Sequence, residues 1–144
     1  MITQVGSFKL PESINKFKDE KTRLPRILGV LSLRHFLEGF RKGGFTDDKF
    51  VRWQKRFKRL PRGRFSRTLK EPANLIKTGA LRRSLRIKNA TFSQVKIFTS
   101  IKYASKHNIG IPPIPQRKFV GDSKVLVKNL KKRIFKETDK VFKV

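Results

Sequence analysis

The feature that most limits how this chain can fold is its charge. Thirty-seven lysine and arginine residues stand against ten aspartate and glutamate residues, which gives a formal net charge of +27 over 144 residues. A compact state with this charge repels itself, and a polyanionic partner or acidic protein neighbours would relieve the repulsion. Nucleic acid is the default partner of a basic chain, because binding releases counterions from the phosphate backbone. Many basic proteins instead lie beside acidic subunits in an assembly, so both classes of partner stay open although the charge alone favours nucleic acid.

The apolar content is high enough for a folded core. Hydrophobic residues make up 37% of the chain and include thirteen phenylalanines, and a chain of this length has little room for a second core. We therefore expect residues 1–144 to form a single domain. The absence of cysteine excludes disulfides and thiolate metal sites. No apolar run approaches the roughly 20 residues that span a bilayer, so we expect a cytoplasmic chain with no membrane partner.

The N-terminal part is predicted to be helical after a short arm over residues 1–10. A first helix is expected to open at Pro11, where proline suits the first turn. A second and longer helix is expected over 24–40, because its apolar residues recur at helical spacing. Pro25 would lie in the first turn of that second helix, and Gly43 would follow its end.

Residues 41–74 are predicted to form an extended basic loop. A short helix from Phe45 that contains Phe50 and Trp53 would open it, and prolines and glycines interrupt the remainder. Trp53 and its basic neighbours are candidates for contact with a phosphate backbone or an acidic protein. The basic candidates in this segment are Arg52, Lys55, Arg56, Lys58, Arg59, Arg62 and Arg64. The alternative is a solvated loop whose aromatic residues pack on the domain.

A β-hairpin is expected over residues 81–102. The first strand is expected over 81–88, although Arg83 falls on its apolar face, and the turn is expected at Asn89-Ala90. The second strand, over 95–102, alternates more regularly between apolar and polar residues.

The C-terminal third combines a short turn, an extended segment and the last helix. A helical turn over 103–108 would stop at Gly110, and the prolines of 111–115 require an extended chain. The last helix is expected over 123–144 with Asp122 as its N-cap. Its expected apolar stripe is Leu126, Val127, Leu130, Ile134 and Val141. The predicted fold is therefore α+β, with a small antiparallel sheet packed against a long helix of the N-terminal half and a C-terminal helix.

No group of residues in the sequence indicates catalysis. The ten carboxylates are scattered, and none forms a pair at a spacing that acid–base chemistry favours. His35 and His107 are far apart in sequence, and we expect a packing role for the first and a turn role for the second. A metal site needs three or four ligands, and the glycines lack the context of a phosphate-binding loop. We expect no enzyme activity, no cofactor and no metal.

Three short motifs together resemble a known family. They are LIKTGALRRSL at 75–85, YASKHNIG at 103–110 and IPQRKFVGDS at 114–123. Their order and spacing resemble the phage virion morphogenesis family, which includes the tail-completion proteins of Mu-like and P2-like phages and is related to head–tail connector proteins. That family has a TG-x-LR-x-S segment, a strand pair, a YA-x-x-H-x-x-G turn and an IP-x-R-x-F segment before a final helix. The motif region over 75–123 and the aromatic segment ending in Trp53 carry the resemblance.

The motif residues have physical roles that suit a scaffold. The residues expected to support the fold are Gly79, Leu81, Tyr103, His107, Gly110, Pro115 and Phe119. Tyr103 would bury its ring, and Phe119 would anchor the start of the last helix to the core. Arg117 is expected to point away from Phe119 toward a neighbouring subunit, and Arg82 and Arg83 are further interface candidates.

The resemblance implies a structural protein of a tailed bacteriophage virion, acting in tail completion or head-to-tail joining as a subunit of a neck ring. It implies a homo-oligomeric ring of six- or twelve-fold symmetry beside acidic neck, connector and tail-terminator proteins, with contact to genomic DNA in the channel left open. The chain would lie in the head–tail neck of the virion, and in the host cytoplasm during assembly. The alternative is a basic nucleic-acid-binding protein of ribosomal or nucleoid type, which the charge supports.

Overall fold

The computed structural model describes residues 10–54, 75, 78–91 and 94–142, with side chains described between residues 18 and 140 of these ranges. The predicted α+β class is confirmed. The elements in chain order are α1 (Leu10–Lys42), β1 (Gly44–Thr46), β2 (Phe50–Arg52), α2 (Ala80–Ser84), β3 (Arg86–Ala90), β4 (Val95–Phe98), α3 (Ala104–Ile109) and α4 (Lys124–Phe142).

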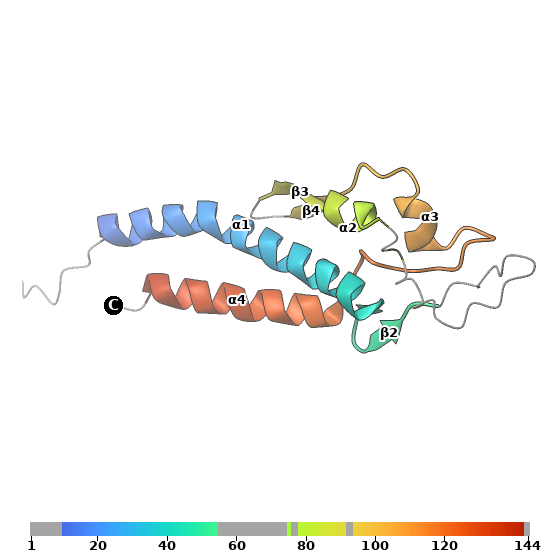
Figure 1. The fold of residues 1–144 in the computed structure, drawn as a ribbon. Helices are drawn as coiled ribbons and strands as arrows, with labels where there is room; N and C mark the ends of the chain where they lie inside the picture. Colours follow the sequence, from blue (N-terminus) through green and yellow to red (C-terminus); the bar gives the residue numbers. More distant parts are fainter. Residues whose placement is uncertain (1–9, 55–74, 76–77, 92–93, 143–144) are drawn as a thin grey trace, which may run out of the picture.

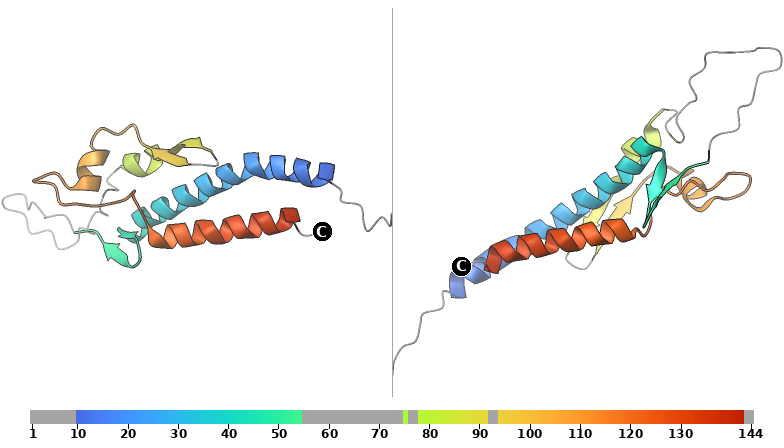
Figure 2. Two further views of the ribbon diagram at one scale, coloured as in Figure 1. Left: turned by 180° about the vertical axis from the view of Figure 1, so that it is seen from behind. Right: turned by 90° about the horizontal axis from the view of Figure 1, so that it is seen from below.

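The long helix α1 is the central element of the fold. Helix α4 runs beside it in the opposite direction, and the β3–β4 hairpin packs on another side of α1 (Figure 1). The β1–β2 hairpin follows the C-terminal end of α1, and α2 and α3 lie beyond the β3–β4 hairpin at the same end of the molecule (Figure 2). The C-terminal end of α4 therefore lies beside the N-terminal part of α1.

Helix α1 is continuous, so the prediction of two separate helices is wrong. Pro25 lies inside it, where a proline removes one backbone hydrogen bond and crowds the preceding turn. Leu24 and Pro25 are both buried, so tertiary packing over this turn offsets the local penalty. The prediction failed because the sequence shows the penalty of the proline but not the packing that compensates for it.

The segment after α1 forms a β-hairpin, and the short helix predicted from Phe45 is wrong. β1 pairs antiparallel with β2, with Phe45 opposite Val51. The backbone N–H of Trp53 donates to the carbonyl of Gly43 at 2.9 Å, which closes the open end of the hairpin. Phe45 is buried, whereas Phe50 and Val51 are exposed, so β2 has exposed side chains on both of its faces.

The predicted second hairpin is confirmed, but its first strand starts later than expected. β3 pairs antiparallel with β4, with Ile87 opposite Ile97. The residues before β3 form α2, and Leu81 and Leu85 are both buried. Residues four apart share a side in a helix as well as in a strand. The helix explains why Arg83 is exposed, which the strand prediction could not. Asn89 and Ala90 are part of β3, so the predicted turn there is also wrong.

The core is built where α1, α2, α3 and the segment before α4 meet. Its buried members are Phe40, Trp53, Leu75, Leu81, Leu85, Ala104 and Phe119. The ring of Phe40 lies 5.3 Å from that of Trp53 and 5.4 Å from that of Phe119, between centroids. A second cluster of Phe36, Phe45 and Leu126 joins α1, β1 and α4.

Helix α4 begins at Lys124, one residue later than predicted. The Leu126 N–H donates to the Ser123 hydroxyl at 3.1 Å, so Ser123 and not Asp122 is the N-cap. Its buried side includes Leu126, but Val127 is 49% exposed and is therefore wrongly assigned to the apolar stripe. The side chain of Val141 lies outside the described residues.

Candidate interaction surfaces

Residues of the second and third family-like motifs meet Trp53 in a set that we call the junction, namely Trp53, Asn108, Arg117 and Phe119. Asn108 is half-buried and the other three are buried. Phe119 is 3% exposed, as predicted for an anchor of the last helix. The Trp53 indole N–H donates to the carbonyl of Lys118 at 2.6 Å. This bond ties the end of the β1–β2 hairpin to the segment that leads into α4.

Asn108 is the junction residue that organises the backbone around it. Its Oδ1 accepts hydrogen bonds from the N–H groups of Phe119 at 2.8 Å and Val120 at 3.1 Å. Its Nδ2 donates to the carbonyl of Val120 at 3.0 Å. One side chain thus satisfies three backbone groups of the extended segment. The sequence contains a signal for this role, since asparagine before a helix-ending glycine often bonds nearby backbone, but its distant partners could not be read from it.

Arg117 is buried, so the prediction that it reaches a neighbouring subunit is wrong. Its side chain is 5% exposed, and its Nε donates to the carbonyl of Gln54 at 3.0 Å. Its backbone N–H donates to the carbonyl of His107 at 2.7 Å. Arg117 and Phe119 are two residues apart in an extended segment, and such residues share a side. The burial of Phe119 therefore carries Arg117 inward as well.

The two motif glycines adopt the left-handed backbone that their roles require. Gly79 has φ of +70° before α2, and Gly110 has φ of +83° after α3. The Gly110 N–H donates to the carbonyl of Lys106 at 3.0 Å and closes the helix end. The prediction of a helical turn ended by Gly110 is confirmed.

Tyr103 is 45% exposed, so the prediction of a buried ring is wrong. It is the N-cap residue of α3, and its ring meets that of His107 edge-on at 5.8 Å between centroids. Ala104 enters the core instead, at 4% exposure. The tyrosine therefore covers the outside of α3. Pro115 is half-buried in the extended segment.

The residues predicted to contact a partner differ in their exposure, and some of them lie outside the described residues. Arg52 on β2 and Arg82 and Arg83 on α2 are exposed, and the guanidinium of Arg83 donates to the Thr78 carbonyl at 2.8 Å. Trp53 is 4% exposed, which matches the alternative in which it packs on the domain. The remaining candidates, Lys55, Arg56, Lys58, Arg59, Arg62 and Arg64, lie outside the described residues and stay predictions.

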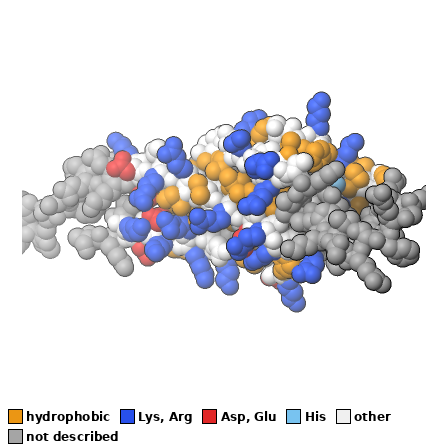
Figure 3. Space-filling model, viewed as in Figure 1, with side chains coloured by type: hydrophobic (Ala, Val, Ile, Leu, Met, Phe, Trp, Pro, Cys, Tyr) orange, Lys and Arg blue, Asp and Glu red, His pale blue; other side chains and the backbone are white. Residues whose placement is uncertain are grey.

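A surface that was not singled out from the sequence runs along the outer side of α4. We call it the lysine strip, and its residues are Lys124, Val127, Lys128, Lys131, Lys132, Phe135 and Lys136. Basic side chains project along the edge of the molecule where α4 lies (Figure 3). Phe135 is 68% exposed and Val127 49%. Two shallow grooves of about 630 and 500 Å³ line this side and share Lys132 and Phe135.

The inner side of α4 contains a buried acid. Glu137 is 0% exposed, and its carboxylate pairs with Arg133 at 2.8 Å and Lys140 at 3.1 Å. The hydrogen bond from Lys140 lowers the pKa of Glu137 below its ordinary value; burial opposes this, and the charges of Arg133, Lys140 and Arg23 add to it. Arg23 belongs to α1, whereas Arg133 and Lys140 are on α4 with Glu137.

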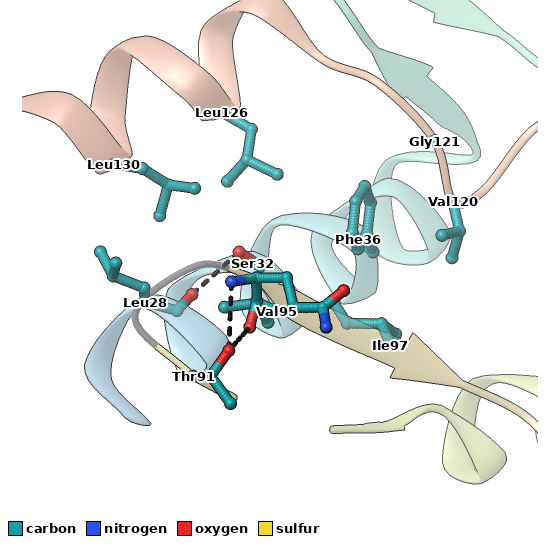
Figure 4. Close-up of a pocket in the computed structure, with 11 residues that line it drawn as sticks. Leu28, Ser32, Phe36, Thr91, Val95, Ile97, Val120, Gly121, Leu126 and Leu130 are labelled. Carbon is teal, nitrogen blue, oxygen red and sulfur yellow. Dashed lines mark hydrogen bonds between the residues drawn. The ribbon is translucent and has the colours of Figure 1, made fainter. Parts of the chain in front are cut away.

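An apolar cavity of about 400 Å³ lies between α1, the β3–β4 hairpin and α4 (Figure 4). Its principal lining residues are Leu28, Ser32, Phe36, Val95, Ile97, Leu126 and Leu130. The Ser32 hydroxyl donates to the carbonyl of Leu28 at 2.8 Å, so this polar group is already satisfied. None of the described residues that line the cavity has an ionisable side chain.

His35 has the packing role that was expected of it. Its Nε2 lies 3.2 Å from the Thr46 carbonyl and 3.1 Å from the Ser123 hydroxyl, joining α1 to β1 and the start of α4. Over the described parts of the chain, no three histidine, cysteine, aspartate or glutamate residues are grouped as metal ligands would be. None of the helices in those parts has the length and apolar character needed to cross a bilayer.

Comparisons with family models, curated proteins and solved structures found no match to this chain. The family resemblance therefore rests on the three motifs and on what their residues do in the fold.

Proposed function

We propose that this chain is a structural subunit of a tailed-bacteriophage virion that acts in tail completion or head-to-tail joining. The observation that carries the proposal is the convergence of the three family-like motifs on one core cluster. Leu81 of the first motif, Ala104 of the second and Phe119 of the third are buried together there. Motifs that meet in this way act as one structural unit, which is what a shared family scaffold would require.

The roles of the motif residues support a scaffold and not a reaction site. Asn108 satisfies backbone groups, Gly79 and Gly110 provide left-handed turns, and Phe119 fills the core. Each of these roles fixes the path of the chain. A joint protein needs this kind of rigidity, because its work is to hold a shape between neighbours.

The charge supports a position among acidic partners. Subunits of +27 arranged in a ring of six- or twelve-fold symmetry would produce a strong positive field. Acidic surfaces on neighbouring neck, connector and tail-terminator proteins would neutralise it, and basic residues facing the channel would meet genomic DNA. Membership of such a ring places the chain in the neck of the virion, and in the host cytoplasm before assembly.

Quantitative mass spectrometry of purified particles tests the proposal. We expect the chain at a fixed, small copy number per particle, equal to the subunits of one or two rings. Particles assembled without it should accumulate as separate heads and tails. Absence of the chain from mature, infectious particles would overturn the proposal.

A nucleic-acid-binding protein of ribosomal or nucleoid type is the second candidate, and the charge of +27 is the observation that favours it. Such a protein binds nucleic acid tightly, with an affinity that falls linearly on a log–log plot against salt. Titration of fluorescent duplex and single-stranded oligonucleotides across salt concentrations measures this slope. Tight binding at physiological salt, together with absence from particles, would establish the second candidate over the first.

A further inference from the structure

Most of the lysine strip lies on the side of α4 that is turned away from α1, while Lys132 and Lys136 also border a groove between the two helices. Lys124, Lys128, Lys131 and Phe135 follow one another at spacings of three and four residues, which places them on one side of a helix. The buried residues Leu126 and Glu137 occupy the other side. All members of the strip are exposed.

Two apolar side chains stand within this basic surface. Phe135 is 68% exposed and Val127 49%, so both leave apolar area in water that a partner could cover. They are eight residues apart, which corresponds to roughly 12 Å along a helix axis at 1.5 Å per residue. Anchor side chains on one side of a second helix recur at a similar distance.

The lysines of the strip have no acidic partner within the described part of the chain. Lys124, Lys128, Lys131, Lys132 and Lys136 make none of the ion pairs found there, which on α4 involve only Arg133, Glu137 and Lys140. Asp47 and Asp122 border the groove where α4 begins, and Asp139 borders the second groove farther along the helix. The positive charge is therefore concentrated over the middle of the helix. A second copy of the same strip would place lysines against lysines, which disfavours self-association here.

The mixture of charge and apolar area distinguishes among anionic partners. A nucleic acid duplex would use the lysines but would leave Phe135 and Val127 against phosphates and sugars. A single strand can stack a base on Phe135, but Val127 has no ring to offer. An acidic amphipathic helix satisfies both features, because its carboxylates meet the lysines while its apolar side chains cover Phe135 and Val127.

We propose that the lysine strip binds an acidic amphipathic helix of a neighbouring protein. This inference rests on the function proposed above in taking that neighbour to be another virion subunit. Phe135 serves as the central apolar anchor and the lysines fix the orientation of the partner helix. The lysines also raise the rate of encounter, since complementary charge steers association.

Fluorescence anisotropy with the purified full chain tests the inference. The probe is a labelled synthetic peptide with leucines along one side of a helix and glutamates on the others. A peptide of the same composition in permuted order, which has the charge without the apolar side, is its control. Labelled oligo-dT serves as the nucleic acid probe.

Two kinds of variant separate the anchor from the charge. Phe135→Ala removes the anchor, and Val127→Ala provides a second, milder test of the apolar contact. The combination Lys128→Gln, Lys131→Gln and Lys132→Gln removes three charges from the strip. The combination Lys96→Gln, Lys102→Gln and Lys106→Gln removes three charges from exposed lysines on and after β4, and is the matched control. Circular dichroism verifies that each variant is folded.

We expect Phe135→Ala to weaken binding of the amphipathic peptide about tenfold, as loss of an aromatic anchor does. The strip triple should weaken it several-fold more than the control triple. Equal losses from the two triples, or equal binding of the permuted peptide, would overturn the inference by showing non-specific attraction. Loss of oligo-dT binding in Phe135→Ala without loss of peptide binding would overturn it in favour of a single-strand surface.

The outcome is independent of the particle measurement. A chain that is present in virions but binds the peptide without regard to Phe135 would refute this inference alone. A chain that is absent from virions but binds the peptide through the strip would refute the proposed function alone.

Discussion

The junction and the lysine strip lie on either side of the start of α4. They differ in whether their polar side chains bond to other groups of the same chain. In the junction, the indole of Trp53, the amide of Asn108 and the guanidinium of Arg117 all bond to backbone of the same chain. On the strip, five lysines surround two exposed apolar side chains and make no ion pair within the described residues. The comparison teaches that the motif residues hold the fold, while the surface that we propose for a partner lies elsewhere.

The largest expected difference between the two regions comes from their phenylalanines. Phe119→Ala should lower the free energy of unfolding by about 3–5 kcal/mol, because it empties a packed site against Phe40. Urea denaturation followed by circular dichroism measures the change. A value near zero would mean that Phe119 is not part of the core, and the contrast between the two regions would fail.

Removal of the junction amide should have the next largest effect. Asn108→Ala leaves the N–H groups of Phe119 and Val120 without their acceptor, and should lower the free energy of unfolding by about 2 kcal/mol. The same denaturation experiment applies. Asn129→Ala, at an exposed position of α4, is the control and should change stability by less than about 0.5 kcal/mol. Equal effects at the two positions would show that the hydrogen bonds of Asn108 do not organise the junction.

The buried acid of α4 predicts a dependence of stability on pH. The pKa of Glu137 is lower in the folded chain than its ordinary value of 4.5. Its charged form therefore stabilises the fold above that pH, and the contribution is lost as the pH falls through the lowered pKa. Urea midpoints measured from pH 7 to pH 3 should fall on acidification, and Glu137→Gln should reduce this fall.

The control for this titration is Asp139→Asn, which changes an exposed acid on the same helix. It should leave the fall in stability close to that of the unchanged chain. If Glu137→Gln has the same acid response as the unchanged chain, the ion pairs of Glu137 with Arg133 and Lys140 within α4 do not stabilise the fold.

The smallest expected change in stability belongs to the strip. Phe135→Ala should alter the free energy of unfolding by less than about 0.5 kcal/mol, because an exposed ring has little packing to lose. Denaturation measures this beside Phe119→Ala. A loss above 1 kcal/mol would show that Phe135 packs on the chain itself and is not available to a partner.

The sequence predicted those features that depend on local pattern. The hairpin of β3 and β4, the short helix ended by Gly110 and the core position of Phe119 are confirmed. Each follows from alternation, from the backbone freedom of glycine or from the apolar character of one residue. These signals lie within a few residues of the feature that they predict.

The errors arose where distant contacts decide the outcome. Pro25 was expected near a helix start, but packing over that turn keeps α1 continuous. Leu81 and Leu85 fitted a strand and a helix equally well, and only tertiary contacts distinguish the two. The burial of Arg117 and Glu137 depends on partners that a single sequence does not identify. The lysine strip could not be recognised from the sequence either, because its two exposed apolar residues become visible only when the buried side of α4 is known.

The most direct test of this account is an image of the particle neck at side-chain resolution. The account predicts that the junction lies inside each subunit and that the lysine strip is covered by an acidic helix of a neighbouring protein, with Phe135 at the centre of the contact. A neck that lacks this chain would contradict the proposed function. A chain in place with α4 facing solvent would contradict the claim that the strip is the surface through which it binds.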